Sequence, residues 1–294
     1  MKIKELARIV GKKAMETGKV GELIATDLSD LEIFSKHQET TFEATHYHPV
    51  FCLILQGKKE TIVGDQAFSY SEGDAIVVSH ELPVVSRITQ ATEKSPYLAL
   101  IFYLDLDLLR NLDGRTEVCD QKSECATSMT VHRAEEPLID ALQRYFDLLN
   151  NPVDIEVLGP LISKEIHYRL LVAPYGAMLR KIANRDSHAS RIARAIGMIR
   201  EQYKSNLRIP EIADSVGMSA SSFHDHFKSV TQTTPLQYQK DLRLMEAKRL
   251  LGLGSRSVSQ IAYEVGYESP NQFSREYARK FGLAPTQDGK TQLA

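Results

Sequence analysis

The stretch from Ser257 to Pro285, SVSQIAYEVGYESPNQFSREYARKFGLAP, decides the fold of the C-terminal part of this chain. It predicts two short helices joined by a tight turn at Gly266, because glycine readily takes the left-handed backbone that ends a helix. Ser257 is expected to cap the first helix, with Gln260 completing a capping box three residues later.

The second predicted helix of this stretch has one apolar and one polar face. Ser269 is expected to cap it, with Gln272 closing a second capping box. Phe273, Tyr277 and Phe281 recur every four residues and are expected to face inward. The side chains left on the outer face are Asn271, Gln272, Ser274, Arg275 and Arg279. Amides, hydroxyls and guanidinium groups hydrogen-bond to base edges and phosphates in a DNA major groove, so we predict a DNA-reading helix-turn-helix.

The same pattern occurs about fifty residues earlier, in the stretch 207–231, LRIPEIADSVGMSASSFHDHFKSVT. An internal repeat of both turns and both capping serines indicates two copies of one motif. The segment between the copies, TPLQYQKDLRLMEAKRLL, begins at Thr234 with the capping pattern of a helix, including Gln237. A helix of roughly 18 residues spans about 27 Å, which suits two reading helices near one turn of DNA apart.

These residues resemble the DNA-binding domain of AraC/XylS-type transcription regulators over about residues 190–285. The resemblance implies base-facing positions in both reading helices: Ser221, His224 and Asp225 in the first, and Asn271, Gln272, Ser274 and Arg275 in the second. Lys228, at the far end of the first helix, is expected to meet a phosphate. Asp225 would repel phosphate, although it can accept from a cytosine amino group. We therefore expect sequence reading to depend mainly on the second helix.

Length and charge divide the chain into two parts. A chain of 294 residues is expected to form two domains. Residues 188–285 hold 14 Lys and Arg against 9 Asp and Glu, whereas residues 1–187 hold 21 against 28. Basic residues thus gather where DNA is expected. A Lys-bearing amphipathic helix over 3–17, with no signal peptide and no long apolar run, predicts a cytoplasmic protein without membrane association.

The N-terminal half reads as short strands with frequent turns, which favours an antiparallel barrel or sandwich. The strands predicted from period-two alternation are 31–34, 51–55, 61–63, 67–70, 75–78, 84–88 and 98–104. The runs HYHPVFCLILQG and SEGDAIVVSHELP resemble the two halves of a cupin barrel, as in the N-terminal domain of some AraC-type regulators. The predicted fold class is α+β: a cupin-like domain (1–175), an interdomain linker (176–190) and an all-α domain with two helix-turn-helix motifs (191–294). Within the linker, residues 177–182 can still form a helix.

Two amphipathic helices are predicted beside this barrel, over 137–149 and 154–172. Their apolar stripes could pack on the barrel or on a second subunit. The resemblance favours a homodimer contact here.

His46, His48 and His80 are the candidate ligand-binding residues of the barrel. The H-x-H spacing begins the pattern of metal-binding cupins, but the carboxylate expected a few residues downstream is replaced by an apolar run. We therefore predict neither a metal site nor a cofactor. These histidines are expected either to line the barrel mouth or to lie at a strand end, and they are the candidates for holding an unidentified small-molecule effector.

The three cysteines form neither a disulfide framework nor a zinc motif. Cys119 and Cys125 lie in a polar segment, where they are either unremarkable loop residues or sensors of an oxidant or electrophile. Cys52 alternates within an apolar strand and is expected to belong to the core.

The sequence therefore predicts a regulator that binds double-stranded promoter DNA and is not an enzyme, with RNA polymerase as a further partner if it activates. The alternatives are a cupin-fold enzyme fused to DNA-binding helices and a barrel that serves only for assembly.

Overall fold

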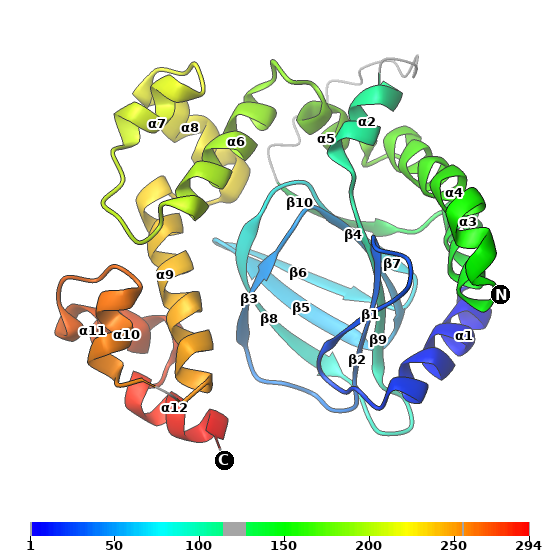
Figure 1. The fold of residues 1–294 in the computed structure, drawn as a ribbon, viewed down its shortest axis with the longest axis horizontal. Helices are drawn as coiled ribbons and strands as arrows, with labels where there is room; N and C mark the ends of the chain where they lie inside the picture. The colour runs from blue at the N-terminus through cyan, green and yellow to red at the C-terminus, as the bar shows by residue number, and fades with distance from the viewer. Residues whose placement is uncertain (1, 114–127, 255, 294) are drawn as a thin grey trace.

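The computed structural model describes residues 2–113, 128–254 and 256–293. Two parts lie side by side (Figure 1): an N-terminal part of strands covered by helices, here β1–β10 with α1–α5, and a C-terminal part of helices α6–α12. The predicted α+β class is confirmed. None of the helices in the described ranges is long and apolar enough to cross a membrane.

The described strands of the N-terminal part form two antiparallel sheets. One sheet has six strands in the order β1-β2-β9-β4-β7-β10, and the other has four in the order β3-β8-β5-β6. The strands are β1 (Leu23–Ala25), β2 (Leu31–Lys36), β3 (Glu43–Tyr47), β4 (Val50–Gln56), β5 (Lys58–Val63), β6 (Gln66–Ser71), β7 (Asp74–Val78), β8 (Leu82–Gln90), β9 (Tyr97–Tyr103) and β10 (Met129–Arg133). The seven predicted strands are all present, whereas β1, β3 and β10 were not predicted.

The run VFCLIL in β4 is continuously apolar because both faces of this central strand are covered. Phe51, Leu53 and Leu55 pack into a core between the six-stranded sheet and the helices, while Val50 and Ile54 pack into a second core between the two sheets. The strand β9 divides its side chains in the same way. The N-terminal part therefore has a helix–sheet layer and a sheet–sheet layer.

Helices cover the outer face of the six-stranded sheet (Figure 1). They are α1 (Lys2–Thr17), α2 (Leu106–Asp113), α3 (Glu136–Asp147), the short 3-10 turn Leu148–Asn150, α4 (Pro152–Val172) and α5 (Gly176–Ala183). The predicted helices over 3–17, 137–149 and 154–172 are present. Residues 176–190, expected to be a linker, include α5, whose Met178 and Leu179 are buried in the helix–sheet core. The stretch between α5 and α6 is 184–187.

The C-terminal part consists of two helical halves that share α9. Its helices are α6 (His188–Glu201), α7 (Ile209–Ser215), α8 (Ala220–Thr231), α9 (Pro235–Gly252), α10 (Val258–Glu264), α11 (Pro270–Phe281) and α12 (Pro285–Leu293). Tyr238 and Leu242 of α9 pack in the first half, and Leu244 and Leu250 pack in the second. This arrangement confirms the predicted pair of helix-turn-helix units (α7–α8 and α10–α11) joined by one helix.

The predicted cap of α10 is present in full. Ser257 Oγ accepts from the Gln260 backbone N–H, and the Gln260 side chain accepts from the Ser257 N–H. The second predicted box is only half formed, because Ser269 caps α11 while the Gln272 amide donates to Glu276 one turn later. Thr234 likewise caps α9, but the Gln237 side chain donates to Asp241 instead of closing the box.

Gly266 makes the turn between α10 and α11 at a φ of 97°. A Cβ there would lie 2.2 Å from the Lys204 carbonyl oxygen. The turn thus needs glycine for both its backbone angle and the close approach of another chain segment.

Candidate functional site

The reading helix α11 presents the polar face that the sequence predicts. Phe273 and Tyr277 are fully buried, while Asn271, Gln272 and Arg275 are exposed. Arg279 is exposed as well, and Ser274 is half-buried. The buried aromatic residues hold one side of the helix against the second half of the C-terminal part, so the opposite side is left for a partner.

Hydrogen bonds within the protein hold part of the polar face of α11 in place. Arg275 Nε donates to the Asn271 carbonyl at 3.3 Å. The Gln272 amide donates to Glu276, which also accepts from Lys240 Nζ at 3.0 Å and from the Tyr267 hydroxyl at 2.8 Å. These bonds to Lys240 and Tyr267 lower the pKa of Glu276 against the effect of its burial, so its carboxylate stays charged.

The first reading helix, α8, is built in the same way with different chemistry. Phe223 and Phe227 are buried, and the predicted reading residues are all exposed with the N-terminal part in place: Ser221, His224, Asp225 and Lys228. This face carries an acidic side chain, whereas the α11 face combines two amides with arginines. Charge therefore favours α11 over α8 for close approach to phosphates.

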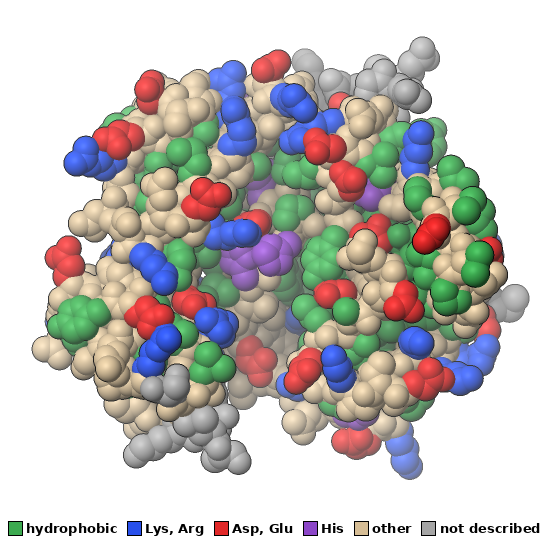
Figure 2. Space-filling model, viewed as in Figure 1, with side chains coloured by type: hydrophobic (Ala, Val, Ile, Leu, Met, Phe, Trp, Pro, Cys, Tyr) green, Lys and Arg blue, Asp and Glu red, His purple; other side chains and the backbone are tan. Residues whose placement is uncertain are grey.

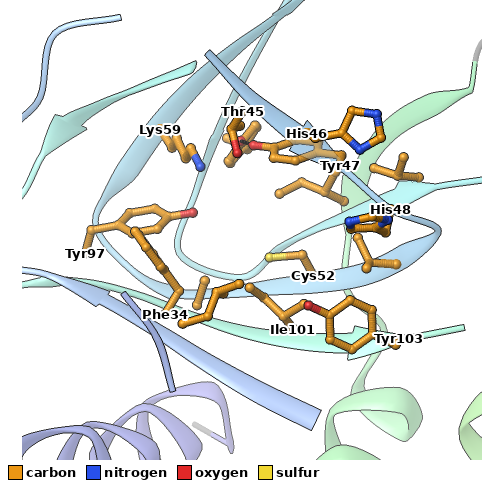
Figure 3. Close-up of a pocket in the computed structure, with 16 residues that line it drawn as sticks. Phe34, Thr45, His46, Tyr47, His48, Cys52, Lys59, Tyr97, Ile101 and Tyr103 are labelled. Atoms are coloured by element: carbon orange, nitrogen blue, oxygen red, sulfur yellow. Dashed lines mark hydrogen bonds between the residues drawn. The ribbon is translucent and has the colours of Figure 1, made fainter. Parts of the chain in front are cut away.

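Between the two sheets lies a cavity of about 290 Å³. Its walls are mainly apolar and aromatic, including Phe34, Cys52, Tyr97 and Ile101 (Figure 3). The Lys59 amino group points into it from β5, near Phe34 and Tyr47, and Lys59 is the one Lys or Arg among the described residues that line it. Burial raises the pKa of the Cys52 thiol to about 12, so this cysteine is a neutral part of the wall.

The three predicted ligand-binding histidines separate into two environments. His46 of β3 and His48, the residue just after β3 ends, line the cavity together (Figure 3), with ring centroids 5.2 Å apart. His80 is buried and does not belong to the described lining. Burial lowers the pKa of His80 to about 4, and the neutral ring donates from Nε2 to the Ala189 carbonyl while Nδ1 accepts from Ser79. His80 thus holds the N-terminal part to the start of α6.

Two comparisons with protein families decide the identity. The model of the AraC-type transcriptional regulator N-terminus matches residues 27–178, more than half of the chain, and a helix-turn-helix domain model matches residues 212–290. This chain belongs to the AraC-type transcriptional regulators.

Relatives of this AraC-type regulator include a transcriptional activator. The HTH-type transcriptional activator RhaS of Escherichia coli O1:K1 / APEC is 31% identical over 191 residues, which cover 64% of this chain and 67% of RhaS. A crystal structure of ToxT from Vibrio cholerae O395 aligns over 90% of this chain and 97% of its own, with a TM-score of 0.53 and 12% identity. ToxT bound to (E)-4-(8-methylnaphthalen-1-yl)but-3-enoic acid aligns over 90% and 98%, with a TM-score of 0.52 and 14% identity.

The two parts of this AraC-type regulator meet at Glu81, just before β8. The Glu81 carboxylate accepts from Arg200 of α6, and its backbone carbonyl accepts from the Tyr238 hydroxyl of α9 at 2.9 Å. A second contact joins the Ser128 hydroxyl to the Val230 carbonyl at the end of α8. The regulator therefore has polar contacts between its N-terminal part and three helices of its C-terminal part, α6, α8 and α9.

Sequence reasoning did not identify Glu81, Arg200 or Lys59 as functional residues. Glu81 directly follows His80 in the sequence, whereas the carboxylate of the H-x-H pattern is expected a few residues downstream of His48. The charged Lys59 falls at an inward-facing position of a strand, and this is the feature of the sequence that indicates a cavity there. Cys119 and Cys125, the candidate sensors, lie outside the described residues.

Proposed function

We propose that this protein recognises a specific promoter sequence through α8 and α11, and that a small molecule bound between its sheets controls this binding. The observation that carries the proposal is the repeated helix-turn-helix unit with an exposed polar face on each second helix. In this proposal residues 1–175 sense and dimerise, 176–190 connect, and 191–294 bind DNA. The barrel, which we take to be cupin-like, binds a ligand and performs no catalysis.

Specificity is assigned mainly to α11. Arg275 can offer its guanidinium fork to the paired acceptors of guanine, and Asn271 or Gln272 can pair with adenine. Arg279 and Lys228 are assigned to phosphates, with Ser274 as a further contact. On α8, Ser221, His224 and Asp225 read bases more weakly, and Asp225 would select a cytosine amino group.

The effector is proposed to be a largely apolar molecule with one acidic or acceptor group. A cavity of about 290 Å³ with mainly apolar walls suits a small ring system or a short chain. Lys59, His46 and His48 are the polar groups placed to hold its acceptor end. ToxT, which shares the overall fold, is found with a carboxylic acid of this kind, which supports the same ligand class here.

A homodimer is proposed through α4 rather than through both predicted helices. The stripe on α3, including Leu138, Leu142 and Tyr145, is buried in the protomer's own core. The outer side of α4 instead carries an exposed apolar row: Val153, Val157, Leu161, Tyr168 and Val172. Exposed apolar side chains in a row on one helix are typical of a subunit contact.

The test is a selection of duplexes from a random pool by the full-length protein, followed by footprinting on promoters that contain the selected sequence. We expect one enriched motif with two half-sites about one helical turn apart. The Asn271→Ala/Arg275→Ala double variant should retain random binding but lose the enrichment. A wild-type protein that enriches no sequence would contradict the proposal.

The effector is tested separately, by thermal shift of the full-length protein with a panel of apolar carboxylic acids and with the matching alcohols. We expect the acids to stabilise the wild-type protein and Lys59→Met to remove the preference for acid over alcohol. Equal shifts in the wild type and in Lys59→Met would contradict the assignment. The chain is proposed to act in the cytoplasm, and to contact RNA polymerase if it activates.

A further inference from the structure

At the junction of the two parts, three ligand-type side chains that are far apart in the sequence come together. His46 lies on β3, His48 directly follows that strand, and Glu81 lies just before β8; their ligand atoms lie within 4.8 Å of one another. Figure 2 shows histidine side chains gathered in the hollow between the N-terminal and C-terminal parts, beside charged side chains of both signs.

Two of these groups are buried and have no hydrogen-bond partner in the described structure. They are Nε2 of His46 and Oε2 of Glu81. A buried carboxylate oxygen and a buried imidazole nitrogen each cost free energy if they stay unpaired, so such a pair needs an explanation. A cation bound by these two side chains would give buried atoms of this kind a partner.

We propose that His46, His48 and Glu81 bind one divalent transition-metal ion, in competition with Arg200 for the charge of Glu81. Two imidazoles and one carboxylate form a ligand set for Zn²⁺, Fe²⁺ or Co²⁺ and leave coordination positions open for water. Bonds of about 2.1 Å require the ligand atoms to move closer than they stand. His48 can rotate to do so, because 48% of its side chain is exposed.

Arg200 links this site to the C-terminal part. Its guanidinium pairs with Oε1 of Glu81, from which His48 Nδ1 lies 3.6 Å. A positive charge beside the carboxylate weakens metal binding, and by linkage a bound metal weakens the Arg200 contact that joins α6 to the N-terminal part. This site shares His46 and His48 with the proposed effector cavity, but metal binding requires neither DNA nor an effector, so the metal titration and the effector test can fail separately.

The test is a titration of untagged, chelator-treated full-length protein with Zn²⁺ and Co²⁺, with Co²⁺ absorption reporting the ligands. We expect one ion per chain and visible Co²⁺ bands without the ultraviolet thiolate transition. His48→Gln, at a half-exposed position that should not disturb folding, and His46→Gln should each lower affinity at least about tenfold, as loss of a direct ligand exceeds the loss of a supporting contact. Arg200→Gln should raise affinity about tenfold, since a neighbouring charge shifts such equilibria by at least that factor.

His37→Gln is the matched control, because His37 pairs with Glu93 at 3.0 Å on the surface and belongs to no group of three ligand-type side chains among the described residues. It should bind metal like the wild type. The proposal is overturned if the wild type binds no more tightly than His48→Gln, if His37→Gln loses the ion equally, or if Co²⁺ shows thiolate ligation. Unchanged affinity in Arg200→Gln would overturn the competition with Arg200.

Discussion

Comparing Arg275→Ala with Lys228→Ala separates base reading from phosphate binding, because each substitution removes one positive charge. Arg275 is exposed on α11, and its hydrogen bond in the described structure is the long one to the Asn271 carbonyl, so Arg275→Ala should leave the fold intact. A bidentate arginine–guanine pair contributes about 1–3 kcal/mol of discrimination. Since about 1.4 kcal/mol is tenfold, operator affinity should fall about 5- to 150-fold.

Lys228 is exposed near the end of α8, where we expect a phosphate contact. Lys228→Ala should weaken operator and random DNA by similar factors. Loss of one phosphate contact should make the plot of log affinity against log salt concentration shallower by about 0.9. Over a fourfold rise in salt concentration, the affinity of the variant should therefore fall about 3.5-fold less than that of the wild type. Arg275→Lys keeps the charge but not the fork, and should match Arg275→Ala at the operator while binding random DNA like the wild type.

The assay is fluorescence anisotropy of full-length protein on the selected operator and on a random duplex, at four KCl concentrations. The ratio of the two affinities is the decisive quantity. If Arg275→Ala lowers affinity for random DNA as much as for the operator, the base-reading assignment is wrong. If Lys228→Ala changes the ratio but not the salt slope, the two roles have been assigned to the wrong residues.

Three further predictions concern stability and assembly. Gly266→Ala should lower the free energy of unfolding by more than about 2 kcal/mol, because the added Cβ would meet the Lys204 carbonyl. Gly282→Ala is the comparison, because Gly282 has a φ of 76° but open space around it, and it should lower the free energy of unfolding by about 1 kcal/mol. Urea unfolding of the two variants measures the difference. Leu161→Glu places a charge in the exposed row of α4 and should convert a dimer to monomers in sedimentation, unless α4 is not the contact. Ser257→Ala should cost about 1 kcal/mol in the same unfolding assay, and no loss would mean that the cap is dispensable.

The sequence alone determined the features that depend on residues close to one another in the chain. The helix-turn-helix repeat could be recognised because caps, turn glycines and four-residue apolar spacing act within a few residues of each other, and the structure confirms those helices. The run VFCLIL likewise indicated a strand. In contrast, β1, β3 and β10 were missed because strands that are short or only partly buried carry little alternation to detect.

Tertiary structure decided which of several apolar faces were used. The sequence showed stripes on both α3 and α4 but could not say which would be buried, since that depends on how each helix packs on the sheet. The structure buries the stripe of α3 and leaves a different row of α4 exposed. It also placed α5 in the expected linker, because its apolar residues complete the helix–sheet core.

The chemistry at the junction of the two parts was decided by tertiary structure alone. His46 and His48 are visible as a pair in the sequence, but Glu81 is more than thirty residues away, and only the antiparallel pairing of β3 with β8 brings it beside them. Arg200 arrives from a helix more than a hundred residues later. No local pattern encodes such a meeting, because strand pairing and the docking of two parts set distances that sequence spacing does not contain.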